Sequence, residues 1–142
     1  MTSFYKTADS FKQGSRTLPQ RYYIEDLLLE EEIENIFFNR WLCIGRSNEI
    51  KKSGEYKIFT IGNESLFIIR NENNQLMAFY NTCRHRGTRI CSKKNGIYSK
   101  SIQCPYHGWT YDLSGRLIGA PNMDAVEQFN KDNYPLFPAD LI

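Results

Sequence analysis

The sequence predicts a mainly β fold with antiparallel sheets, preceded by one N-terminal helix. Two observations carry this prediction: an apolar pattern with the helical period ends near Trp41, and several short segments with a period of two follow it. With 142 residues, 41% hydrophobic and 24% charged, the chain has the size and composition of one globular domain. Its net charge of +2 indicates neither a nucleic acid nor an anionic membrane as partner.

The helix is expected over Asp26–Asn39, after a polar arm. Apolar residues in this segment recur at the spacing of one helix face, and glutamates lie near its start, where the helix dipole favours them. The residues of this face are Leu29, Ile33, Ile36 and Phe37. We therefore assign residues 1–40 to an N-terminal arm and helix.

Strands are expected from Trp41 onward, where short segments rich in β-branched and aromatic residues alternate with turn-forming residues. The predicted strands are WLCIGR (41–46), EYKIFTI (55–61), SLFIIR (65–70) and QLMAFYN (75–81). The residues from 83 to 111 are expected to form two hairpin tips, with Asn95-Gly96 as a turn between them. Leu117-Ile118 is expected to be a last short strand.

We assign residues 41–120 to this β domain and residues 121–142, which three prolines interrupt, to a linker. Apolar runs such as Leu66–Ile69 are far shorter than the roughly 20 residues that cross a bilayer. The N-terminus has no apolar leader segment. We therefore predict a cytoplasmic protein with reduced thiols and no membrane partner.

Both histidines of the chain and two of its four cysteines lie at the ends of a basic segment without acidic residues. Cys83 and His85 form one pair, and Cys104 and His107 form the other. A single Cys–His pair is weak evidence for a site, because a lone Cys is more often a small core residue. Two pairs, each followed closely by a glycine, predict a metal site.

The ligand types decide between metals. Structural zinc sites usually pair cysteine with cysteine and histidine with histidine along the chain, whereas each segment here supplies one thiolate and one imidazole. This arrangement suits two metal atoms, with Cys83 and Cys104 on one iron and His85 and His107 on the other. It is the ligand set of a Rieske [2Fe–2S] centre. A zinc-binding interaction module remains an alternative.

Two longer motifs, CRHRG and CPYHGW, extend these pairs. With Trp41-Leu42 before them and Tyr111-Asp-x-x-Gly115-Arg-Leu after them, they resemble the Rieske domain of aromatic-ring-hydroxylating oxygenase α subunits. The resemblance extends from about residue 19 to the C-terminus. It implies a Rieske-type [2Fe–2S] cluster whose four ligands are Cys83, His85, Cys104 and His107.

Residues beside the ligands have expected roles in the cluster environment. Gly87 and Gly108 permit a positive φ and a close approach of the backbone to the cluster. Tyr106 and Trp109 either shield the cluster or serve as ordinary core aromatics. The basic residues of the first segment form either a solvated loop or a docking surface for an acidic electron donor. These basic residues are Arg84, Arg86, Arg89, Lys93 and Lys94.

The motifs differ from those of the high-potential Rieske proteins of cytochrome bc complexes. Those proteins resemble C-T-H-L-G-C with C-P-C-H-G-S, and their additional cysteines form a disulfide between the cluster loops. Thr88 and Tyr106 stand at those positions here, which favours the low-potential branch. We expect Cys43 to lie in the core and Cys91 to be a bystander.

An oxygenase α subunit also needs a mononuclear Fe(II) held by two histidines and a carboxylate, and both histidines of this chain are committed to the cluster. The resemblance implies one-electron transfer, as the N-terminal part of such a subunit, to a mononuclear iron in a missing C-terminal catalytic domain. It implies an NAD(P)H-dependent reductase, a ferredoxin or both as electron donor, and a homotrimer in which that iron lies in a neighbouring subunit. A stand-alone Rieske ferredoxin is the alternative, so whether the chain is part of an enzyme stays open.

Overall fold

The computed structural model describes Gly14 and residues 16–142, which fall into two compact units. The first unit ends at Trp41. It contains α1 (Arg21–Ile24), α2 (Asp26–Glu32) and a π-helical turn over Ile33–Phe37. The expected helix is therefore confirmed over most of its length, while most of the expected arm lies outside the described residues. In the described part of the chain, no helix has the length and apolar character that crossing a bilayer requires.

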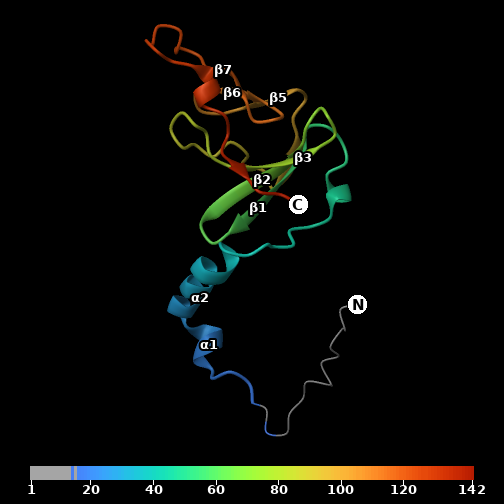
Figure 1. Ribbon diagram of the computed structural model, residues 1–142, viewed down its shortest axis with the longest axis vertical. Coiled ribbons are helices and arrows are strands. Elements are labelled where there is room, and N and C mark those ends of the chain that lie inside the picture. The colour runs from blue at the N-terminus through green and yellow to red at the C-terminus, as the bar shows by residue number, and fades with distance from the viewer. Residues whose placement is uncertain (1–13, 15) are drawn as a thin grey trace. The chain divides into compact units, whose positions relative to one another are not determined.

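The second unit, Leu42–Ile142, contains two antiparallel sheets. The larger sheet has the strand order β4-β1-β2-β3-β8 and the smaller sheet the order β5-β6-β7. Figure 1 labels β1, β2 and β3 of the larger sheet and the three strands of the smaller one. The strands are β1 Glu55–Ile61, β2 Glu64–Arg70, β3 Leu76–Tyr80, β4 Asn95–Ile97, β5 Ser101–Gln103, β6 Thr110–Asp112, β7 Leu117–Gly119 and β8 Pro138–Ala139. The mainly β fold class is thus confirmed.

Side-chain alternation along β2 and β3 builds the core of this unit. Phe67, Ile69 and Phe79 are at most 2% exposed and lie in the main hydrophobic cluster. Ile68 and Ala78, which point the other way, belong to a second, smaller cluster. The main cluster also takes in buried residues of the smaller sheet and of the two Cys–His segments, namely Ile102, Trp109, Tyr111, Cys83 and Cys104. The candidate site is therefore anchored in the core.

Two predicted elements differ in the structure. WLCIGR pairs with no strand. The chain turns directly after it, where Arg46 N–H donates to Glu49 Oε1 at 3.0 Å and Glu49 N–H donates to Arg46 O at 3.0 Å. Cys43 is consequently exposed and not a core residue. Asn95-Gly96 is not a turn but part of β4, where Gly96 pairs with Tyr56 of β1. Glycine fits there because a Cβ would lie 2.8 Å from the Tyr56 ring.

The segment 121–142 packs against the β domain. Leu136 is 1% exposed, and its N–H donates to Gly115 O at 2.8 Å. Tyr80 N–H donates to Phe137 O at 2.9 Å, and the next residues form β8 on the edge of β3. A linker role for this segment stays a prediction.

Candidate metal centre

The two Cys–His segments form turns with the same backbone pattern. In the first turn, Gly87 N–H donates to Cys83 O at 2.9 Å; in the second, Gly108 N–H donates to Cys104 O at 3.2 Å. Each cysteine N–H also donates to the carbonyl five residues further on, at 2.9 and 2.8 Å. Gly87 and Gly108 both have φ near 72°, a left-handed conformation that favours glycine. Two sequence motifs of different spacing thus give two equivalent turns.

These turns bring the thiols and the imidazoles together. Cys83 and Cys104 are 2% and 3% exposed. The rings of His85 and His107 meet edge to face, with 4.7 Å between their centroids. Burial raises the pKa of the Cys83 thiol, although the Tyr111 hydroxyl opposes that shift and the neighbouring Cys104 thiol adds to it. Burial, followed by His107 and Arg86, lowers the pKa of His85, so the neutral imidazole that a metal requires is favoured.

The chemistry of these side chains fits an iron–sulfur cluster. The Nδ1 atom of His85 is buried and has no hydrogen-bond partner among the described residues. A buried polar atom without a partner is costly, and coordination of a metal would remove that cost. No three His, Cys, Asp or Glu side chains of the described part of the chain surround a point that would hold a single ion. A two-iron cluster does not need such a group, since each iron takes two protein ligands beside the bridging sulfides.

Comparison with known families agrees with this geometry. Residues 40–130, which include both turns, match the family described as the Rieske [2Fe-2S] domain. The chain belongs to this family. The cofactor of this Rieske domain is therefore a [2Fe–2S] cluster, as the two Cys–His pairs predicted.

Relatives of this Rieske domain are oxygenase subunits. It is 38% identical over 134 residues to a glycine betaine monooxygenase oxygenase subunit of Chromohalobacter salexigens, covering 93% of this chain and 30% of the relative. It is 39% identical over 114 residues to biphenyl 2,3-dioxygenase subunit alpha of Rhodococcus jostii, covering 80% of this chain and 25% of the relative. The chain thus spans about a third or less of the length of these relatives.

Solved structures give the same answer for the fold. The quaternary ammonium Rieske monooxygenase CntA, in complex with gamma-butyrobetaine, has a TM-score of 0.77 and 37% identity, covering 84% of this chain and 34% of CntA. Naphthalene 1,2-dioxygenase from a Rhodococcus species has a TM-score of 0.72 and 32% identity, covering 78% of this chain and 26% of that protein. The predicted resemblance to the Rieske domain of oxygenase α subunits is confirmed.

Aromatic side chains contact both imidazoles of this Rieske domain. Trp109 is 2% exposed and stacks on His85, with 5.0 Å between ring centroids and 12° between planes. Two aromatic residues of the segment after β7 pack edge-on against Trp109, namely Phe129 and Tyr134. Tyr106 lies over His107 at 3.8 Å but is 62% exposed. Trp109 is thus a core residue that also stacks on an imidazole, and its shielding of the cluster stays a prediction. Tyr106 is not a core residue.

Tyr111 contacts one of the predicted ligands, although the sequence motif gave it no role. Its side chain is fully buried, and its hydroxyl lies 3.4 Å from Cys83 Sγ. The backbone N–H of Arg84 donates to the same hydroxyl at 3.1 Å, which leaves the O–H proton for the sulfur. Burial raises the pKa of Tyr111, so the hydroxyl keeps this proton. Hydrogen bonds to ligand sulfurs are one of the determinants of cluster potential.

Replacing Tyr111 by Phe is expected to lower the reduction potential of the cluster. The hydrogen bond to Cys83 Sγ favours the more negative, reduced state, and its loss costs about 1 kcal/mol, or about 40 mV for a one-electron couple. Tyr98→Phe is the matched control, because the Tyr98 hydroxyl lies 3.5 Å from the sulfur of Cys91, which is outside the predicted ligand set. Protein-film voltammetry of the wild type and both variants measures the effect. A Tyr111→Phe potential equal to that of the wild type would contradict the role of Tyr111.

Proposed function

We propose that this chain carries one electron at a time through a [2Fe–2S] cluster held by Cys83, His85, Cys104 and His107, as the Rieske part of an oxygenase α subunit. The observation that supports this assignment is the pair of equivalent glycine turns, which gather two buried thiols and two imidazoles. Oxygenase subunits match this chain at 36–39% identity, which favours this role over that of a stand-alone ferredoxin.

The side chains of the site divide into an insulated side and an open side. Cys83 and Cys104 are buried in the main core, where solvent has no access to them. His107 is exposed, and His85 is partly buried between His107 and Trp109. When bound, the cluster supplies a site that accepts and returns one electron. We infer that His107 is the edge through which an electron enters or leaves, because it is the proposed ligand nearest to solvent.

The test of the cluster assignment is the iron, acid-labile sulfide and zinc content per chain of anaerobically purified protein. Two irons and two sulfides without zinc are the expected result. One zinc without labile sulfide, persisting after attempted cluster reconstitution, would contradict the assignment and favour a structural zinc module.

The oxygenase reaction itself requires residues outside this sequence. The chain has two histidines, and both belong to the proposed cluster site. A mononuclear iron with two histidines and a carboxylate must therefore be supplied by a catalytic domain elsewhere.

One related structure is described as giving insights into inter-subunit electron transfer, which supports our proposal that the electron leaves towards a neighbouring subunit of a homotrimer. Glycine betaine and biphenyl oxygenase subunits match this chain at 38% and 39% identity, so the similarity selects no substrate class.

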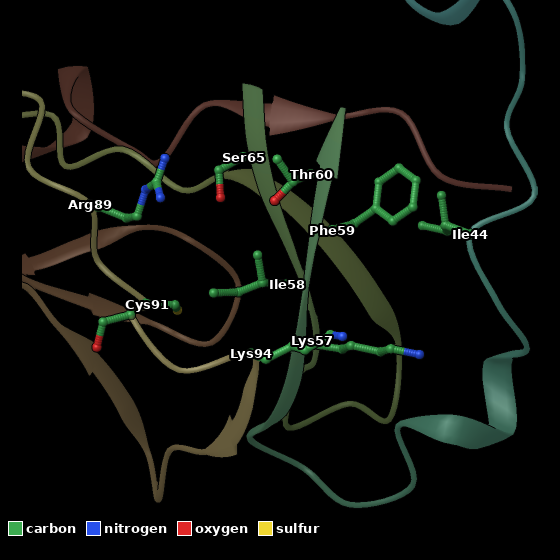
Figure 2. A pocket seen from close by; sticks show the side chains of 10 residues that line it. Ile44, Lys57, Ile58, Phe59, Thr60, Ser65, Arg89, Cys91 and Lys94 are labelled. Atoms are coloured by element: carbon green, nitrogen blue, oxygen red, sulfur yellow. The ribbon is translucent and has the colours of Figure 1, made fainter. Parts of the chain in front are cut away.

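We further propose that the electron donor, a reductase or ferredoxin, is acidic and docks on the basic face of the first turn. Arg86, Arg89, Lys93 and Lys94 are exposed, and the described residues contain no salt bridge to any of them. Arg89 and Lys94 line a hollow of about 550 Å³ between β1 and the chain after the first turn (Figure 2). Unpaired charges of one sign near a redox centre steer a partner of the opposite sign.

Charge reversal tests this docking surface. The double variant Arg89→Glu/Lys94→Glu is expected to reduce the second-order rate of cluster reduction by an acidic plant-type ferredoxin about tenfold or more at low salt. The effect should shrink as ionic strength rises, because salt screens exposed charges. The double change Lys51→Glu/Lys52→Glu, before β1, alters the net charge by the same four units and gives the control. Equal stopped-flow rates for wild type and double variant at low salt would place docking elsewhere.

A further inference from the structure

The two turns that present the proposed ligands share a backbone pattern but have different supports. The turn with Cys104 and His107 is the tip of the hairpin of β5 and β6, whose pair Gln103↔Thr110 flanks it directly. The turn with Cys83 lies between β3 and β4, where residues 81–94 belong to no strand. The two ends of this turn must therefore be held together by hydrogen bonds that do not belong to a pair of strands.

The side chain of Asn81 provides that support. Its Oδ1 atom accepts hydrogen bonds from Ile90 N–H at 3.1 Å and from Cys91 N–H at 2.8 Å. Its Nδ2 group donates to Cys91 O at 2.8 Å and to Ser65 Oγ at 3.2 Å. The backbone N–H of Asn81 donates to Ser65 O at 2.8 Å. One side chain thus pairs with both the N–H and the C=O of Cys91, as a neighbouring strand would, and ties the turn to β2.

Burial makes these bonds difficult to replace. Asn81, Ile90 and Cys91 are 2%, 4% and 1% exposed, so water does not reach their backbone groups. Removal of the Asn81 amide would leave two N–H groups and one C=O group buried without partners. The ends of the first turn would then have to move apart, or open to solvent, to recover hydrogen bonds.

We propose that Asn81 is a positioning residue for the cluster. By pairing with Ile90 and Cys91, it sets the separation of the two ends of the first turn, and thereby the placement of Cys83 and His85 opposite the second turn. The inference rests on the proposed function in one respect, the assignment of Cys83 and His85 as ligands. Among the described residues, no hydrogen bond joins the Asn81 side chain to the side chain of Cys83 or His85.

Asn71 offers a matched control within the same protein. It is also an asparagine with 2% exposure. Its Oδ1 atom accepts from Gln75 N–H at 2.9 Å, and its Nδ2 group donates to Gln75 Oε1 at 3.2 Å and to Ser114 Oγ at 3.4 Å. These partners lie outside both cluster turns. Asn71→Ser therefore removes a buried amide of the same size without loosening a turn that carries ligands.

The experiment compares Asn81→Ser with Asn71→Ser by labile sulfide per chain, the EPR g-values of the reduced protein and the midpoint potential. Both variants are expected to unfold at lower temperature. Only Asn81→Ser should lose half or more of its labile sulfide, and its remaining cluster should show shifted g-values and a shifted potential. Identical g-values, potential and sulfide content in the two variants would overturn the positioning role.

A milder variant covers the case in which Asn81→Ser yields no folded protein. Asn81→Asp keeps the Oδ1 acceptor for Ile90 N–H and Cys91 N–H but loses the Nδ2 donor to Cys91 O, and it is expected to alter the g-values with most of the cluster retained. An unaltered EPR spectrum in Asn81→Asp would then overturn the proposal. Absence of labile sulfide from the wild-type protein would instead contradict the proposed function, so the two failures are distinguishable.

Discussion

A Cys104→Ser variant is expected to be isolated without its [2Fe–2S] cluster and to unfold at lower temperature than the wild type. Cys104 is 3% exposed and lies in the main core. Water therefore cannot easily take its place as a ligand of the cluster. A serine hydroxyl is a poor replacement, because soft thiolates are the ligands that iron–sulfur clusters select. Metal binding also contributes to folding, so the protein without the cluster loses that stabilisation. Visible absorbance, labile sulfide and thermal unfolding measure the two effects.

Cys91→Ser is the control for that experiment, and it is expected to retain full cluster content. Cys91 is as deeply buried as Cys104, at 1% exposure, and also belongs to the main core. Burial raises the pKa of its thiol to about 11, so it remains a neutral thiol near pH 7. The variant should lose on the order of 1 kcal/mol of stability, as is usual for a single substitution in a core. Loss of iron in Cys91→Ser would show that the ligand assignment is wrong.

The parts of the fold that the sequence predicted well are those in which one local pattern decides the structure. EYKIFTI matches β1 from its first to its last residue, because β-branched and aromatic residues continue until a Gly-containing turn. WLCIGR also carries apolar and aromatic residues, but it pairs with no strand, and the chain turns directly after it through local bonds between Arg46 and Glu49. Asn95-Gly96 has a typical turn sequence, yet β1 offers an edge on which this dipeptide pairs as a strand. Tertiary pairing thus prevails over the turn sequence of Asn95-Gly96.

For the candidate site, too, the sequence predicted what a local motif determines and missed what contacts between distant residues determine. The proposed ligands and the two glycines stand within two short motifs, so their spacing identified them. Tyr111 acts on Cys83 from a position 28 residues away in the sequence, and Asn81 joins Ser65 to Cys91 over 16 and 10 residues. Neither residue type is distinctive, since a tyrosine in a strand and an asparagine after a strand are both ordinary. Their roles depend on which buried groups lack a partner, and only the three-dimensional structure gives that information.

His107→Cys is expected to lower the reduction potential of the cluster by on the order of 100 mV or more. With two thiolates, two sulfides and two neutral imidazoles, the oxidised centre with two ferric ions carries no net charge. A third thiolate adds one negative charge and makes the entry of an electron less favourable. Rieske centres lie at about −150 to +300 mV, whereas plant-type clusters with four cysteines lie at about −400 mV. The exposed position of His107 on the second turn leaves room for the smaller side chain.

The comparison with Tyr106→Ser makes this result specific to the ligand. Tyr106 lies on the same turn, is 62% exposed and contacts the His107 ring at 3.8 Å, so its removal disturbs the surroundings of the imidazole but not the charge of the ligand set. The reduction potential of the Tyr106→Ser variant is expected to differ from that of the wild type much less than the potential of His107→Cys does. EPR of the reduced His107→Cys protein should in addition move from the Rieske pattern towards that of a cluster with more thiolate ligands. A potential equal to that of the wild type would remove His107 from the ligand set, and with it the open edge through which we infer that the electron passes.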